Sequence, residues 1–95
     1  MTAHQLYAAC DHETQGLLLN CTWGLIAEAD ILTLLIKCPI EEVYWHILGS
    51  LSLLAEQLEN LMEEGAIHIR VYPPPGSGSP LEVGARAIAS HRNLP

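Results

Sequence analysis

The sequence predicts a mainly α-helical winged helix-turn-helix domain that carries one small β-hairpin. Three observations favour this fold class. Apolar residues recur at steps of three and four from Ile40 to Leu61, a spacing typical of helices that pack along one seam. Gly65 then ends the helical pattern, and the apolar residues of 66–72 alternate as on a strand with one buried face. A tip rich in Pro, Gly and Ser follows, and Leu81 begins a second strand pattern, which completes a hairpin.

We expect residues 1–95 to form a single winged-helix domain. Its parts are an N-terminal helical segment (1–22), a helical core with the helix-turn-helix (23–64), the wing (65–84) and a C-terminal helix or tail (85–95). Within the first half, residues 14–37 are dense in Leu and Ile and are expected to be helical and buried. Polar residues interrupt this stretch, so a core helix is favoured over a membrane span.

The next helix is expected to begin at Pro39, because proline suits the first helical position and Glu41 and Glu42 face the positive end of the helix dipole. Two architectures fit the residues that follow. One continuous helix over 39–64 could form a coiled coil and tolerate Gly49 within it. Alternatively, Gly49 and Ser50 form the turn of a helix-turn-helix, which the hairpin downstream favours.

Composition indicates a homodimer without a membrane span. The chain is 49% hydrophobic and 16% charged, which is more apolar surface than a domain of this size hides in one core. The formal net charge is −7, with 11 acidic residues against four Lys and Arg, and this balance disfavours nucleic acid as a partner. The odd number of cysteines and the lack of a secretory signal favour a reducing cytoplasm.

The order of these elements resembles the HxlR-type winged helix-turn-helix transcriptional regulators, which are relatives of the MarR group. The resemblance covers roughly residues 23–89. It rests on a Trp that opens the first core helix, a Pro before the next helix, a Ser at a tight turn, a leucine series that leads to a Gly, and an Arg-Val-Tyr-Pro strand: Trp23, Pro39, Ser50, Leu54, Leu58, Leu61, Gly65 and residues 70–73. Membership of this family would imply a homodimeric regulator that binds DNA.

The charge pattern departs from that family. Residues 39–64 carry six Glu and no Lys or Arg, and the exposed positions of the expected recognition helix include Leu51 and Glu56. Such side chains are poorly suited to bases and phosphates. DNA contacts would then depend on one helix residue and the arginines around the wing: Ser52, Arg70, Arg86 and Arg92.

We therefore expect a non-catalytic regulatory or adaptor protein that acts through protein contacts, with a dimeric DNA-binding regulator as the alternative. The expected docking face for a basic partner combines apolar anchors with acidic residues of helix 39–64: Trp45, Leu53, Glu56, Glu59 and Glu63. The same acidic residues also fit a solvated face without a partner.

The sequence predicts neither an enzyme nor a bound cofactor, because it contains no nucleophile elbow, phosphate-binding loop or acid–base pair. A metal or thiol sensor is a third, weaker hypothesis, for which the candidates are Cys10, His12 and Cys21. Their spacing matches no compact zinc signature, and buried structural cysteines are favoured instead.

Overall fold

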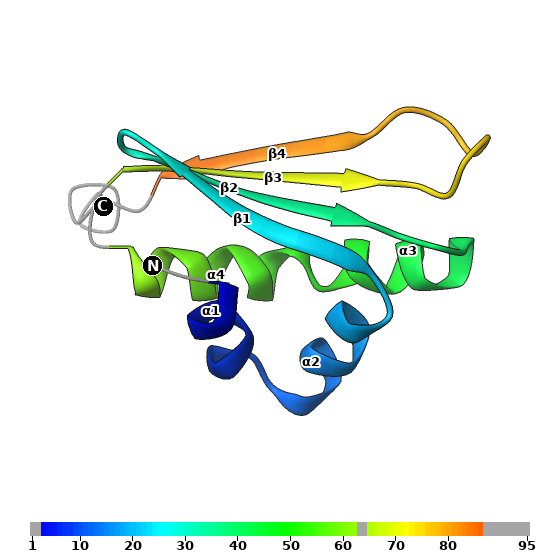
Figure 1. The fold of residues 1–95 in the computed structure, drawn as a ribbon, viewed down its shortest axis with the longest axis horizontal. Coiled ribbons are helices and arrows are strands. Elements are labelled where there is room, and N and C mark those ends of the chain that lie inside the picture. Colours follow the sequence, from blue (N-terminus) through cyan, green and yellow to red (C-terminus); the bar gives the residue numbers. More distant parts are fainter. Residues whose placement is uncertain (1–2, 63–64, 87–95) are drawn as a thin grey trace, which may run out of the picture.

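A computed structural model describes residues 3–62 and 65–86 and shows an α/β fold with a four-stranded mixed sheet. The helices are α1 (Ala3–Ala9), α2 (His12–Leu19), α3 (Glu41–Gly49) and α4 (Leu51–Leu61), and the strands are β1 (Thr22–Glu28), β2 (Ile31–Lys37), β3 (Ala66–Tyr72) and β4 (Leu81–Arg86). The four helices gather beneath one face of the sheet, and none of them lies over the opposite face (Figure 1).

The prediction of a mainly α-helical winged helix is therefore wrong. Most of the correction concerns residues 14–37, which form part of α2 and then the antiparallel hairpin of β1 and β2. An apolar run of this length fits a buried strand as well as a buried helix. In β2 the side chains of Leu32, Leu34 and Ile36 are buried, whereas the two residues between them are only half-buried. This alternation is typical of a strand.

The sheet has the strand order β1-β2-β3-β4, and its central pair, β2 and β3, is parallel. This pairing is closed at both ends by backbone hydrogen bonds: the Ala66 N–H donates to Asp30 O (2.8 Å) and the Cys38 N–H donates to Tyr72 O (3.0 Å). Parallel strands need a crossover between them, and α3 with α4 supplies it. The hairpin expected after Gly65 is present as β3 and β4, but it extends a larger sheet.

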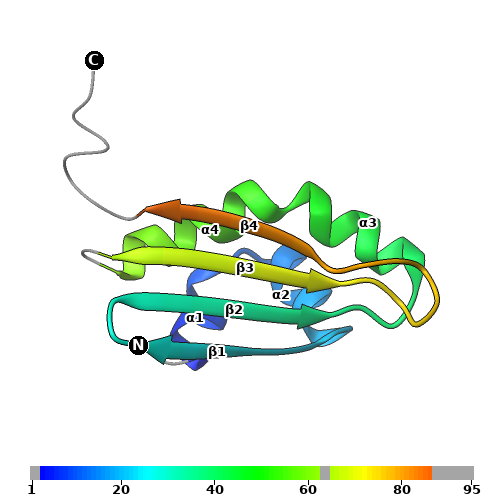
Figure 2. The ribbon, with the colours of Figure 1, turned by 90° about the horizontal axis from the view of Figure 1, so that it is seen from above.

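The turn of the predicted helix-turn-helix is also absent. α3 begins at Glu41, and Ser50 alone separates it from α4. The Ser50 N–H donates to Ile47 O (2.9 Å) and the Leu54 N–H donates to Ser50 O (3.0 Å), so helical hydrogen bonding continues through the break. α3 and α4 run on in nearly the same direction in both views (Figures 1 and 2).

The hydrophobic core lies between the sheet and the helices. Leu34 and Ile69 form its centre on the sheet side, and Leu54 and Leu58 of α4 pack against that side. Leu6 of α1 and the α2 residue Leu18 complete the layer, and both are fully buried. No helix in the described part of the chain is long and apolar enough to cross a membrane. Residues 87–95, which include most of the expected C-terminal helix, lie outside the described residues.

Gly65 joins the helical layer to the sheet, and its geometry leads to a prediction about stability. Its φ is +132°, and an added Cβ would meet the backbone oxygen of Asp30 and the side chain of Met62. We expect Gly65→Ala to lower the free energy of unfolding by about 2 kcal/mol or more. Gly49→Ala is the matched control, because a Cβ there meets nothing within 4 Å and the residue is helical.

Gly49→Ala should raise the free energy of unfolding by about 0.5–1 kcal/mol. Urea denaturation followed by circular dichroism measures both variants. Equally small changes in the free energy of unfolding for the two variants would contradict the positive φ and the close backbone contact that the structure gives Gly65.

Candidate binding surface on the open face of the sheet

The open face of the sheet is formed by alternate residues of each strand. On β2 these residues begin with Ile31 and end with Lys37, and on β3 they begin with Ala66 and end with Tyr72. Their neighbours along each strand point to the core. Seen from above, the strands lie in front of the helices without any element over them (Figure 2). The described part of the chain thus covers only one face of the sheet.

Aliphatic, polar and charged side chains together line a shallow hollow on this open face. The hollow has a volume of about 400 Å³ and is lined from β1, β2 and β3 by Ile26, Glu28, Ile31, Thr33, Leu35, His68, Arg70 and Tyr72. Ile26 and Ile31 are 45% and 46% exposed. Water therefore contacts aliphatic groups on this face that the described part of the chain does not bury.

A network of polar contacts borders the hollow on the β3–β4 side. Glu82 Oε1 accepts hydrogen bonds from Arg70 Nη2 (2.8 Å) and Nε (3.3 Å), and it lies 3.0 Å from His68 Nε2. Hydrogen bonding from Arg70, followed by the positive charge of Arg70 and a smaller effect of His68, lowers the pKa of the Glu82 carboxyl. Arg70 Nη1 also donates to the Tyr72 hydroxyl at 3.4 Å. These contacts hold the guanidinium in place at the edge of the hollow.

The charges of the molecule are divided between its two sides. The two cations whose side chains the structure describes, Lys37 and Arg70, both lie on the open face, and Lys37 Nζ sits 5.8 Å from the centre of the Tyr72 ring. Glu28 and Glu82 balance them on the same face. The helical side instead carries exposed acids without a described Lys or Arg: Asp11, Glu13, Glu41, Glu42 and Glu56. The open face is therefore close to neutral on a chain of net charge −7.

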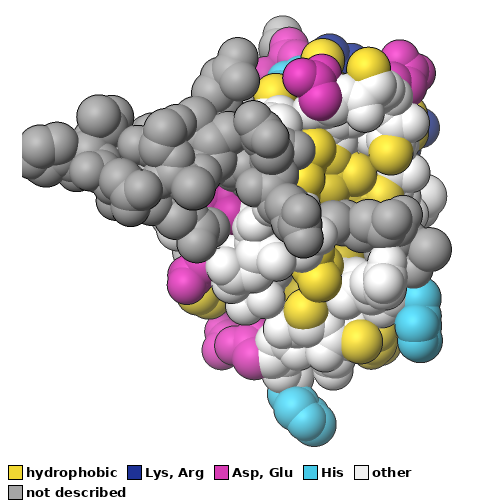
Figure 3. Space-filling model, turned by 90° about the vertical axis from the view of Figure 1, so that its left-hand side faces the viewer, with side chains coloured by type: hydrophobic (Ala, Val, Ile, Leu, Met, Phe, Trp, Pro, Cys, Tyr) yellow, Lys and Arg dark blue, Asp and Glu magenta, His cyan; other side chains and the backbone are white. Residues whose placement is uncertain are grey.

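This mixture of side chains is visible along the upper edge of Figure 3, where acidic, basic, histidine and hydrophobic groups lie together. The arrangement is able to bind a surface of mixed character. In it, His68 and Arg70 both contact the same carboxylate, that of Glu82.

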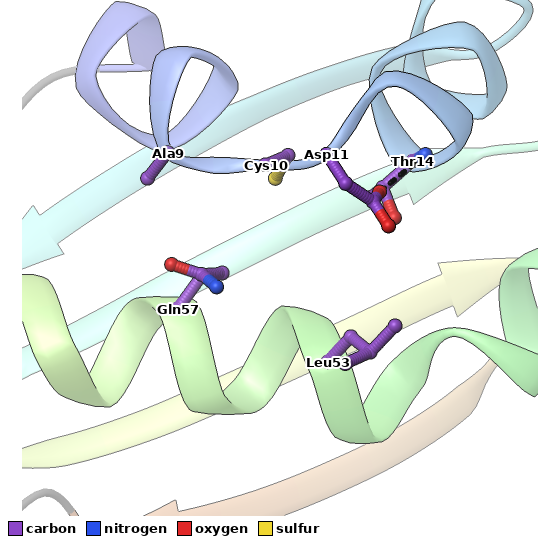
Figure 4. A pocket seen from close by; sticks show the side chains of 6 residues that line it. All are labelled: Ala9, Cys10, Asp11, Thr14, Leu53 and Gln57. Atoms are coloured by element: carbon purple, nitrogen blue, oxygen red, sulfur yellow. Dashed lines mark hydrogen bonds between the residues drawn. The ribbon is translucent and has the colours of Figure 1, made fainter.

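A second, smaller hollow lies between α4 and the connection of α1 to α2. Its volume is about 210 Å³, and its lining is Ala9, Cys10, Asp11, Thr14, Leu53 and Gln57. Figure 4 shows Leu53 and Gln57 on α4 across from the other four residues. Asp11 accepts a hydrogen bond from the Thr14 N–H at 2.9 Å, which caps α2. Hydrogen bonding from the Thr14 side chain, followed by that from its N–H, lowers the pKa of the Asp11 carboxyl. The Asp11 carboxylate therefore serves to cap the N-terminus of α2.

The docking face predicted from the sequence is only partly assembled. Trp45 is 64% exposed on α3 and Leu53 is 48% exposed on α4, but Leu53 turns toward the small hollow beside Cys10. Glu56 is exposed and Glu59 is half-buried, both on α4. Glu63 lies outside the described residues.

The residues predicted to contact DNA are separated. Ser52 is exposed on α4, beneath the sheet, whereas Arg70 lies on the open face and is paired with Glu82. Arg86 ends β4, and its side chain is not among those described; Arg92 lies beyond the described residues. Since α3 and α4 form no helix-turn-helix, the recognition helix that would have held Ser52 over DNA does not exist here.

The candidate metal ligands also lie in separate environments. Cys10 is buried between helices, His12 is exposed at the start of α2, and Cys21 is half-buried at the start of β1. Within residues 3–62 and 65–86, no three His, Cys, Asp or Glu side chains converge in a way that could hold a metal ion.

The structure does bring together two cysteines that the sequence analysis did not pair. Cys21 precedes and Cys38 follows the strand partners Thr22 and Lys37, so the two cysteines lie beside each other at the same end of the β1–β2 hairpin. Burial, with a further effect of Cys38, raises the pKa of Cys21 to about 12. Burial and then the nearby Asp11 raise the pKa of Cys10 as well. Raised thiol pKa values oppose reactivity, because the thiolate is the nucleophile.

Comparison with known proteins identifies no relative: no family model matches the chain, and neither the curated proteins nor the solved structures contain a match.

The thiol environments predict slow alkylation of the folded protein. At pH 8 we expect iodoacetamide to modify Cys21 roughly 100-fold or more slowly than in the chain unfolded by guanidinium, because so little thiolate is present. Mass spectrometry of peptides after timed quenching follows Cys10, Cys21 and Cys38 separately. Modification of folded Cys21 at the unfolded rate would contradict this prediction and would return attention to a thiol sensor.

Proposed function

We propose that this protein is a non-catalytic adaptor that binds another protein through the open face of its sheet. The observation that carries the proposal is the uncovered aliphatic hollow around Ile26, Ile31 and Leu35, bordered by charged groups already held in position by hydrogen bonds. Apolar centres with polar borders are the usual anatomy of protein interfaces. The proposal keeps the protein-contact function expected from composition and moves its site from the acidic helices to the sheet.

An amphipathic helix is the partner element that fits this face best. Strands of seven residues span about 23 Å, which is the length of a helix of about 15 residues. The inner face of the same sheet already packs against the leucines of α4. Lys37 lies at one end of β2, and Glu28 lies beside its other end. A matching helix would therefore present an aliphatic stripe with an acidic residue toward Lys37 and a basic residue toward Glu28.

Selection from a phage-displayed library of random 16-residue peptides tests this proposal. We expect the enriched peptides to carry aliphatic residues at helical spacing together with an acidic residue. Leu35→Asp should weaken their binding at least tenfold, because it places an unpaired charge in the hollow. Leu53→Asp, on a more exposed leucine of α4, should leave the affinity unchanged. Fluorescence anisotropy of labelled peptides measures both, and circular dichroism checks that both variants are folded.

The opposite pattern has a clear meaning. If Leu35→Asp binds the selected peptides like the original chain and Leu53→Asp does not, the site lies on the helical side and the proposal is wrong. Failure to enrich any peptide would also contradict an open face that binds helices.

A further inference from the structure

The strand β1 is an edge of the sheet with few of the usual protections. Among the residues that the structure describes it pairs with β2 alone, and it lies at the margin of the sheet in Figure 2. Its seven residues, TWGLIAE, contain no proline and no lysine, and Glu28 is the single charge. Natural edge strands usually carry such residues because an unpaired row of N–H and C=O groups recruits other strands. β1 is therefore available for pairing.

The other edge, β4, is better protected. Its six residues include Glu82 and Arg86, and Pro80 stands directly before it. Prolines and charges of this kind discourage strand addition. The contrast between the two edges makes β1 the preferred place for an added strand.

The sequence of β1 is complementary to itself in one antiparallel register. When two copies pair around a two-fold axis at Leu25, Trp23 stands opposite the partner's Ala27, and Gly24 stands opposite the partner's Ile26. Each large side chain thus faces a small one on the same side of the sheet. Glu28 stands opposite the partner's Thr22 and avoids a second carboxylate. A shift of one residue would lose this match and would also place opposite faces together.

We propose that two copies of this chain pair through β1 in this register and form one continuous sheet of eight strands. The contact is isologous, so it closes on itself and does not extend into fibres. It also keeps α3 and α4, which carry Glu41, Glu42 and Glu56, away from the seam, whereas a contact through those two helices would bring their acids together. The inference is independent of the proposed function, because the open faces of both copies remain uncovered and become neighbours.

The size of the contact sets the expected affinity. Seven residues from each copy bury less surface than a standard interface, so we expect a dissociation constant in the micromolar range. Sedimentation equilibrium between about 5 and 500 μM covers this range. Dimers should form progressively over it, and a chain that stays monomeric throughout would overturn the proposal.

Thr22→Glu tests the register of the proposed dimer without destabilising the single chain. Within one chain, Thr22 is exposed and pairs with Lys37, so a glutamate there gains a favourable neighbour. Across the proposed dimer it meets the partner's Glu28 twice, and dimerisation should weaken about tenfold at low salt. Glu28→Lys added to Thr22→Glu should restore the dimer, because each glutamate then faces a lysine. Glu28→Lys alone removes no attraction and serves as the control.

Ala27→Asp provides a second test at another position of the proposed seam. Ala27 is exposed in one copy, but in the dimer it faces the partner's Trp23, so an aspartate there places an unpaired carboxylate against an apolar ring and should weaken pairing at least tenfold. Circular dichroism verifies the fold of each variant. A dimer that tolerates both Thr22→Glu and Ala27→Asp would have to use another surface, and the proposal would be wrong.

Discussion

The parallel pairing of β2 with β3 is the constraint on which the rest of this structure depends. It joins the β1–β2 hairpin to the β3–β4 hairpin in one sheet, and it comprises seven pairs of residues. Because parallel strands cannot be joined by a tight turn, the chain between them must cross over one face of the sheet, which α3 and α4 do. Figure 1 shows that α1 and α2 lie on that same side. All four described helices therefore lie on the same face of the sheet.

This one-sided cover determines which parts of the surface can bind. The inner positions of β2 and β3 are buried against helices, whereas the alternate positions face outward and are not covered by any described element. The described cations lie on the outward face, and most of the exposed acids lie on the helices. The edge strand β1 belongs to the same sheet, so a second chain can extend the sheet without covering its open face. The two proposed contacts therefore use different surfaces of one element.

Part of this fold could be predicted from the sequence because the signals are local. The alternation of Ile67, Ile69 and Val71 after Gly65 identifies β3, and the leucine spacing up to Leu61 identifies α4. The hairpin of β1 and β2 was missed because Ala29 and Asp30 form its turn without the Gly or Asn that usually marks one, and Ala29 takes a φ of +51° instead. The partnership of β2 with β3 is not local, and no spacing in the sequence indicates it.

The candidate site shows the same division between local and distant information. Arg70 is a candidate DNA contact in the sequence because it lies in the expected wing, but its partner Glu82 depends on the register across the hairpin tip. Once that hairpin is accepted, the Arg70–Glu82 pair is predictable. The hollow around Leu35 is not, since it needs β1, β2 and β3 side by side. The sequence indicates the acidic face of α3 and α4 because its acids all lie within one segment of the chain. The residues of the open face come from separate strands, so no single segment indicates them.

The central claim is that one face of the sheet is uncovered, and nuclear magnetic resonance of methyl groups with a soluble gadolinium chelate tests it most directly. The account predicts strong solvent relaxation at the methyl groups of Ile26, Ile31 and Leu35. It predicts weak relaxation at Leu34 and Ile36, which alternate with Leu35 on β2 and are fully buried. Equal protection of both sets would mean that another part of the protein covers this face, and it would contradict the account.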